Sequence, residues 1–130
     1  LGKKLYLKVA DLINNNEKPK VLPTQSLKEV IVEMTQKRLG ITAVVDTSNK
    51  LIGIITDGDL RRMLEKNTAI DSIKAGDIMT SNPKTIEPDK LAVDALNLLR
   101  KNEITQLAVT ANGNYEGILH LHDLIREGLI

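Results

Sequence analysis

A short polar turn at residues 56–59 carries the residue types best suited to holding a ligand. It follows an apolar, β-branched run and passes at once into an amphipathic segment, so we expect a strand that feeds a helix. Thr56 offers a hydroxyl, Gly58 leaves room for a close approach, and Asp59 offers a carboxylate. A helix start attracts phosphate, and a carboxylate accepts hydrogen bonds from a ribose diol. The turn therefore favours a nucleotide site.

The same turn also fits a plain capping box, in which Thr56 caps the helix and Asp59 reaches back to it. Asp57 counts against a close phosphate, because a second carboxylate would repel it. Two arginines follow, Arg61 and Arg62. They either form a solvated helix face or capture a phosphate or carboxylate. These alternatives stay open at the level of the sequence.

A second turn of the same kind ends in Asp123, with His120 in place of the threonine and Arg126 three residues further on. On an extended backbone His120 and His122 would share a face and, with Asp123, could begin a metal site. A helix starting here would break that alternation, so we predict no metal. An imidazole can also contact a phosphate, most strongly when protonated. We find no cysteine, glycine-rich phosphate loop or paired serine, and we predict a binding site without catalytic residues.

The two turns belong to an internal repeat. Residues 19–62 align with residues 83–126 without a gap, and ten of the 44 pairs are identical. The identical pairs include Gly53/Gly117, Asp59/Asp123 and Arg62/Arg126. Such a repeat indicates two copies of one structural unit. Each copy alone would be marginally stable at about sixty residues, so we expect the pair to share one aliphatic core.

The sequence of each copy predicts the order β-α-β-β-α, which is an α+β fold. We expect the two copies to pack with pseudo-two-fold symmetry. In the first copy we expect strands at 20–22, 41–45 and 51–55 and a hairpin turn at 46–50. Ser26 and Glu29 have capping-box spacing, and Gly40 is expected to end the helix. The apolar stripe of this helix is Leu27, Val30, Ile31 and Met34. In the second copy we expect Pro88 and Asp89 in the first helical turn, with a stripe of Leu91, Ala95, Leu98 and Leu99.

We predict a linker at residues 1–8, one repeat at 9–74 and the other at 75–130, with a connector at 67–74. The absence of an initiator methionine suggests a fragment.

A net charge of +1 gives no broad attraction to nucleic acid or an anionic membrane, and an aromatic content of 2% disfavours base stacking. No apolar run reaches the roughly 20 residues that span a bilayer. The chain has no cysteine, which permits the cytoplasmic location that we expect.

The tandem β-α-β-β-α units, each with a glycine, two apolar residues and then the turn, resemble a CBS-domain pair (Bateman module). The segments Thr56–Arg62, His120–Leu124 and Leu1–Leu5 are similar to the C-terminal part of D-arabinose 5-phosphate isomerases. That resemblance implies an upstream sugar-isomerase (SIS) domain that performs the chemistry. The family converts D-ribulose 5-phosphate to D-arabinose 5-phosphate, on the way to Kdo and lipopolysaccharide.

The resemblance also implies how a ligand would be held. Thr56 would meet phosphate and Asp59 the ribose hydroxyls, with Gly58 beside them. Base and sugar would be flanked by 21–23 and 41–42, including Leu22 and Thr42. A second site would use 85–86, Thr105–Gln106, His120, His122 and Asp123, where the missing hydroxyl departs from the pattern.

We therefore expect a regulatory module, with no required cofactor, that binds a nucleotide such as AMP or ATP, or a nucleotide-sugar such as CMP-Kdo. It would act on its own SIS domain in the full-length chain and associate as a homodimer. The alternative is a structural dimerisation module without a small-molecule ligand.

Overall fold

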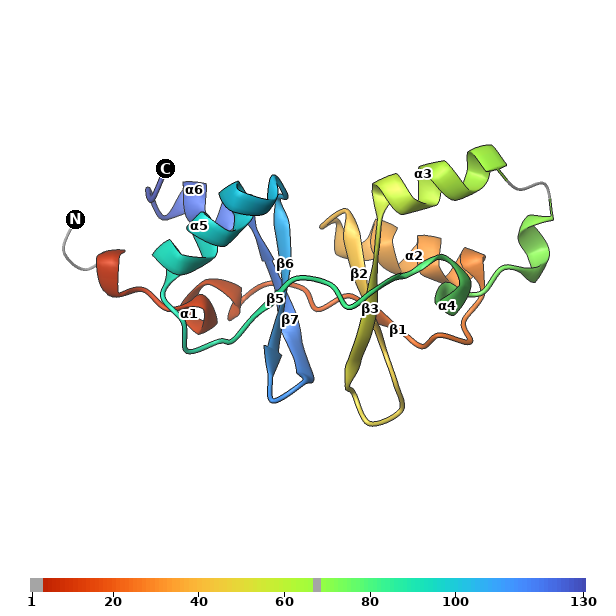
Figure 1. Ribbon diagram of the computed structural model, residues 1–130, viewed down its shortest axis with the longest axis horizontal. Coiled ribbons are helices and arrows are strands. Elements are labelled where there is room, and N and C mark those ends of the chain that lie inside the picture. Colours follow the sequence, from red (N-terminus) through yellow and green to blue (C-terminus); the bar gives the residue numbers. More distant parts are fainter. Residues whose placement is uncertain (1–3, 67–68) are drawn as a thin grey trace.

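The structure is a computed structural model that describes residues 4–66 and 69–130. Two small sheets stand side by side, with helices on their outer sides and both hairpins pointing the same way (Figure 1). The strands are β1 Lys20–Val21, β2 Ile41–Val45, β3 Leu51–Thr56, β4 Thr80–Ser81, β5 Thr85–Ile86, β6 Gln106–Ala111 and β7 Asn114–His120. The helices are η1 Lys4–Tyr6, α1 Val9–Ile13, α2 Leu27–Lys37, α3 Asp57–Lys66, η2 Ile70–Ser72, α4 Ala75–Ile78, α5 Ala92–Asn102 and α6 Leu121–Arg126.

Both sheets have the same topology. β1 runs parallel to β2, which pairs antiparallel with β3, and β5, β6 and β7 repeat this arrangement. The short strand β4 extends the first sheet by pairing with β3. The prediction of an α+β fold made of two β-α-β-β-α repeats is confirmed.

The two sheets meet through a hydrophobic core. Its members are Ile41, Ala43 and Val45 from the first sheet and Ala108, Tyr115 and Ile118 from the second. At the hairpin end the backbones are joined directly, by the N–H of Leu51 to the carbonyl of Gly113 (3.0 Å) and the N–H of Tyr115 to the carbonyl of Asn49 (2.9 Å). Each repeat thus buries the face that the other leaves open, as expected for units too small to stand alone.

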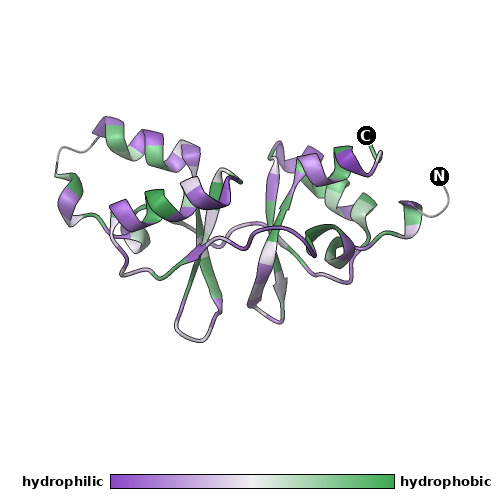
Figure 2. Ribbon diagram, turned by 180° about the vertical axis from the view of Figure 1, so that it is seen from behind, coloured by the Kyte–Doolittle hydropathy of each residue, from purple (hydrophilic) through white to green (hydrophobic). Residues whose placement is uncertain are grey.

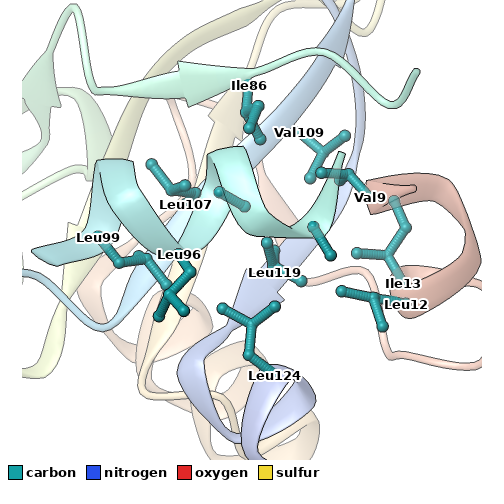
Figure 3. Close-up of a cluster of buried hydrophobic side chains, with 12 residues drawn as sticks. Val9, Leu12, Ile13, Ile86, Leu96, Leu99, Leu107, Val109, Leu119 and Leu124 are labelled. Atoms are coloured by element: carbon teal, nitrogen blue, oxygen red, sulfur yellow. The ribbon is translucent and has the colours of Figure 1, made fainter. Parts of the chain in front are cut away.

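The short helices α1 and α4 each pack on the core of the other repeat. Figure 3 shows the side chains of α1, Val9, Leu12 and Ile13, directed toward Leu119 and Leu124 of the second repeat. Conversely, α4 precedes the second repeat, and its Ala75 is fully buried in the core of the first repeat. The division into units 9–74 and 75–130 stays a prediction, and each core is completed by a helix from the other of these units. Residues 1–3 of the predicted linker and 67–68 of the predicted connector lie outside the described residues.

Two predictions for the helix of the second repeat were wrong, its start and its buried face. Helix α5 begins at Ala92 rather than near Pro88 and Asp89, because Leu91 is extended and bridges to Lys8. The N–H of Ala92 then bonds to the carbonyl of Leu7 at 2.7 Å. The buried face of α5 is consequently Ala92, Ala95, Leu96 and Leu99.

In the first repeat, Ile31 is 39% exposed instead of lying in the core stripe. Helix α2 ends at Lys37, and Arg38 takes the left-handed conformation (φ 60°) two residues before Gly40, which is also left-handed (φ 71°). The capping box of Ser26 and Glu29 is present as predicted. Figure 2 shows hydrophilic residues interspersed with hydrophobic ones along the helices.

Candidate ligand-binding site

The first half-site, defined here as Thr56, Gly58 and Asp59, lies where β3 passes into α3. The hydroxyl of Thr56 accepts the N–H of Asp59 (3.2 Å), and Oδ2 of Asp59 accepts the N–H of Thr56 (3.0 Å). The capping box anticipated from the sequence therefore forms. It fixes the aspartate at the helix start and leaves its carboxylate with further acceptor capacity.

Arg62 covers this turn. Its Nη2 donates to Oδ1 of Asp59 at 2.8 Å, and its side chain is 64% exposed. A Cβ added to Gly58 would lie 3.3 Å from the Arg62 guanidinium, so the glycine faces that group. The ion pair thus joins a largely exposed guanidinium to a carboxylate whose side chain is 14% exposed.

The other two residues predicted for the first half-site, Thr42 and Leu22, lie at opposite ends of β2. Ile41, at the start of β2, pairs with Thr56, which brings neighbouring Thr42 close to the turn. Thr42 is fully buried, however, and its hydroxyl donates to the carbonyl of Ala43. Leu22 follows β1 at the opposite end of β2, where it lines a cavity of about 390 Å³. The structure thus does not bring Leu22 to the turn.

A second cavity, of about 470 Å³, lies between α2 and α3 and reaches the turn. Gly40, Asp57 and Leu60 line it, together with Arg38 and Leu64. A Cβ on Gly40 would come within 3.1 Å of Oδ2 of Asp57. The carboxylate of Asp57 therefore lies beside Gly40, in the loop before β2.

The second half-site, defined as His120, His122 and Asp123, is built in the same way but is more closed. Oδ2 of Asp123 accepts the N–H of His120 at 2.8 Å, and Oδ1 accepts Nη2 of Arg126 at 2.6 Å. Nδ1 of His120 accepts the N–H of His122 at 3.0 Å, in the capping role that threonine has in the first copy. Asp123 is only 3% exposed.

The imidazole of His120 is biased toward its neutral form. Burial lowers its pKa, the nearby His122 lowers it further, and Asp123 acts in the opposite direction. The two imidazole rings lie 4.3 Å apart between centroids. Within residues 4–66 and 69–130, no three His, Cys, Asp or Glu side chains are grouped so as to hold a metal.

The repeats differ in strand register by one residue. Thr56 pairs with Ile41, whereas His120 pairs with Gln106, one position later in the repeat. The carbonyl of Thr105 accepts the N–H of Leu121 at 2.8 Å, so Thr105 lies beside the second half-site. The side chain of Gln106 instead crosses to the first repeat and donates to the carbonyl of Leu39 (2.9 Å).

Sequence reasoning missed two residues next to the aspartates. Nδ2 of Asn16 donates to Oδ2 of Asp123 at 2.9 Å, and Oγ1 of Thr80 lies 3.5 Å from Oδ2 of Asp59. Asn16 and Thr80 occupy equivalent positions of the repeat, on the segments that cross between the two halves. Extending the gap-free alignment toward the N-terminus would have paired them.

Comparison with known proteins decides the family. The CBS domain model matches residues 9–66 and again residues 75–129. The chain belongs to the CBS domain family. It is also 40% identical over 131 aligned positions to arabinose 5-phosphate isomerase KdsD of Yersinia pestis. That match covers 100% of this chain and 40% of the isomerase, so the CBS pair spans well under half of its relative's length.

Solved structures share the fold of this CBS pair. A CBS domain protein from Pyrobaculum aerophilum, complexed with AMP, superposes with a TM-score of 0.81 at 21% identity, covering 91% of this chain and 90% of that one. CBSX2, also in complex with AMP, gives a TM-score of 0.74 at 25% identity, covering 95% and 96%. Among the described residues, no helix is long and apolar enough to cross a membrane.

Proposed function

We propose that this CBS pair is a regulatory module that binds a nucleotide or nucleotide-sugar at the first half-site. The single observation that carries the proposal is the state of Asp59. Its carboxylate is fixed at the start of α3, where it accepts the N–H of Thr56 and the exposed guanidinium of Arg62 and has only a long contact, 3.5 Å, with Oγ1 of Thr80. A ribose diol can replace Arg62 at Asp59, and Arg62 can then turn to the phosphate.

Two further observations support this proposal. Helix α3 has ten residues, and its N-terminus offers backbone N–H groups to a phosphate beside Thr56. Two proteins with the same fold were solved with AMP bound. Adenine nucleotides, AMP and ATP, are therefore the first ligands to test. CMP-Kdo is the candidate nucleotide-sugar if the module senses the end of the pathway that its relatives serve.

The likeness to arabinose 5-phosphate isomerase supports a parent enzyme of that activity, with a catalytic SIS domain upstream in a cytoplasmic protein. In this proposal the CBS pair performs no chemistry. Ligand binding shifts the isomerase between two states, which requires that the ligand have different affinities for those states.

Titration calorimetry against AMP, ATP and CMP-Kdo tests the binding. We expect Asp59→Asn to weaken the bound nucleotide by about 10-fold or more, since hydrogen bonds to a charged group contribute about 1.5–3 kcal/mol. Asp11→Asn is the matched control, because Asp11 caps α1 through the N–H of Lys8 at 2.9 Å without lying at a half-site. If none of the three nucleotides binds, or if both variants behave alike, the proposal is wrong.

A second candidate function is a homodimerisation module, favoured by apolar residues exposed on the first repeat. Ile31 and Val32 of α2, Leu64 of α3 and Ile70 of η2 are 39%, 46%, 49% and 40% exposed. Cavities of about 470 and 500 Å³ flank α2 and share Ile31. Such a cluster suits burial against a second copy of the chain.

Sedimentation velocity separates the two candidates. We expect Val32→Glu to shift a dimer toward monomer, because the charge would be buried at the contact. Tyr6→Glu is the control at a residue that is 78% exposed on η1, away from α2. A monomeric wild-type chain, or a dimer unaffected by Val32→Glu, would rule out this surface. A dimer that ignores every nucleotide would favour the purely structural role.

A further inference from the structure

We infer that Asn16 closes the second half-site, so that a ligand bearing a vicinal diol binds this chain only at Asp59. The inference rests on the proposed nucleotide binding and adds its stoichiometry and the residue that sets it. Asn16 acts through Asp123 and is a positioning residue. Its counterpart Thr80, at the equivalent place in the repeat, leaves the first half-site open.

The closure follows from the acceptors of Asp123. Its Oδ2 already accepts two short hydrogen bonds, from the N–H of His120 (2.8 Å) and from Nδ2 of Asn16 (2.9 Å). Its Oδ1 accepts Nη2 of Arg126 at 2.6 Å. A diol needs acceptor positions on this carboxylate. It would have to remove the amide of Asn16, which also lies 3.4 Å from the carbonyl of Ile118.

Asp59 differs at the equivalent position. Oγ1 of Thr80 is 3.5 Å from Oδ2 of Asp59, too long for a strong hydrogen bond. Only the N–H of Thr56 is held firmly by that oxygen. The side chain of Asp59 is 14% exposed, against 5% for Asp123. One carboxylate can therefore accept a ligand while the other is committed to the fold.

The supporting segments agree with this difference. The segment that carries Asn16 passes close over Gly117, where an added Cβ would lie 3.5 Å from Cδ1 of Ile13 and 3.8 Å from Cγ of Lys18. Helix α6 has six residues, whereas α3 has ten. Its cap is His120. Burial lowers the pKa of this imidazole, so the ring favours the neutral form and attracts a phosphate less than the hydroxyl and longer helix of the first half-site do.

A test without ligand compares the two carboxylates directly. The folded chain is treated briefly with a water-soluble carbodiimide and an amine, and labelling at Asp59 and Asp123 is quantified by peptide mass spectrometry. We expect Asp59 to be labelled several-fold faster. The reciprocal exchanges Asn16→Thr and Thr80→Asn should raise labelling of Asp123 and lower that of Asp59. Equal labelling in the wild type, or no response to the exchanges, would overturn the closure.

Titration with AMP then tests the stoichiometry. We expect one AMP per chain, unchanged affinity in Asn16→Thr at the first half-site, and at least a several-fold loss in Thr80→Asn. Two equivalent AMP molecules per wild-type chain, or normal binding by Thr80→Asn, would contradict the inference. If AMP and the other nucleotides do not bind but the labelling differs as described, the proposed function fails while the closure stands. Chemical denaturation of each variant confirms that it is folded.

Discussion

At the scale of single residues, Asp59 and Asp123 show how one motif can be used in two ways. Both cap a helix and both pair with an arginine three residues later. Their environments diverge through the residue that a crossing segment brings beside them, a threonine in one case and Asn16 in the other. A capping box and a ligand site are therefore compatible, provided that the carboxylate keeps an acceptor free.

His120 makes a pH-dependent contribution to stability. Burial, and then His122, hold its pKa in the folded chain below the ordinary value, while the facing Asp123 opposes them. The neutral ring is favoured by folding. Stability is thus fully present above the unfolded pKa of about 6.5 and is lost as the pH falls below it.

We expect the wild-type chain to lose stability between about pH 7.5 and about pH 5.5, where the unfolded histidine gains its proton. His120→Asn keeps a capping oxygen that can accept the N–H of His122 but cannot titrate. Urea denaturation at the two pH values should show a weaker pH dependence for this variant. An identical slope in both proteins would mean that His120 does not cause it.

At the scale of elements, local signals predicted most of the first repeat. The bounds of β2 and the cap of α2 at Ser26 agree with the sequence, because they depend on β-branched runs and on contacts three residues apart. The start of α5 failed because backbone contacts with Leu7 and Lys8 hold Leu91 extended. The same limit hid Asn16, whose partner Asp123 lies 107 residues away.

The cap of α2 gives a prediction at this scale. Ser26→Ala removes the oxygen that accepts the N–H of Glu29 at 3.2 Å. We expect a loss of about 1 kcal/mol in the free energy of unfolding, measured by urea denaturation. Thr24→Ala, at an exposed residue just before the helix, is the control and should change little. Equal effects of the two substitutions would show that the cap contributes nothing specific.

At the scale of the whole molecule, the exchange of α1 and α4 ties the two repeats together. Val9 of α1 is fully buried in the second core, and Ala75 of α4 is fully buried in the first. The phenolic hydroxyl of Tyr115, in the second repeat, donates to the carbonyl of Pro19 at 2.7 Å. Burial raises the pKa of this tyrosine well above its usual range, so it stays protonated and keeps donating.

We therefore expect a single unfolding transition for both repeats. Val9→Ala removes two buried methyl groups and should cost about 2 kcal/mol. During denaturation, the methyl NMR signals of Val30, in the first repeat, and Leu107, in the second, should report the same unfolding midpoint. Val9→Ala should lower both midpoints by the same amount. Ile125→Ala, a truncation at a residue 49% exposed and outside the surface around α2, is the control. Two separate midpoints would show that the repeats unfold independently.

The position of α1 also decides which repeat responds to a displacement of the N-terminal segment. A displacement of the chain at η1 reaches α1 and hence the second repeat, because α1 packs on β7 and α6. The open half-site lies in the other repeat. A route between η1 and Asp59 therefore runs through the contacts between the repeats, which include the hydrophobic cluster that holds Ala43 and Ile118. The stiffness of the contacts between the repeats would then set how much of a ligand's effect at Asp59 reaches the second repeat.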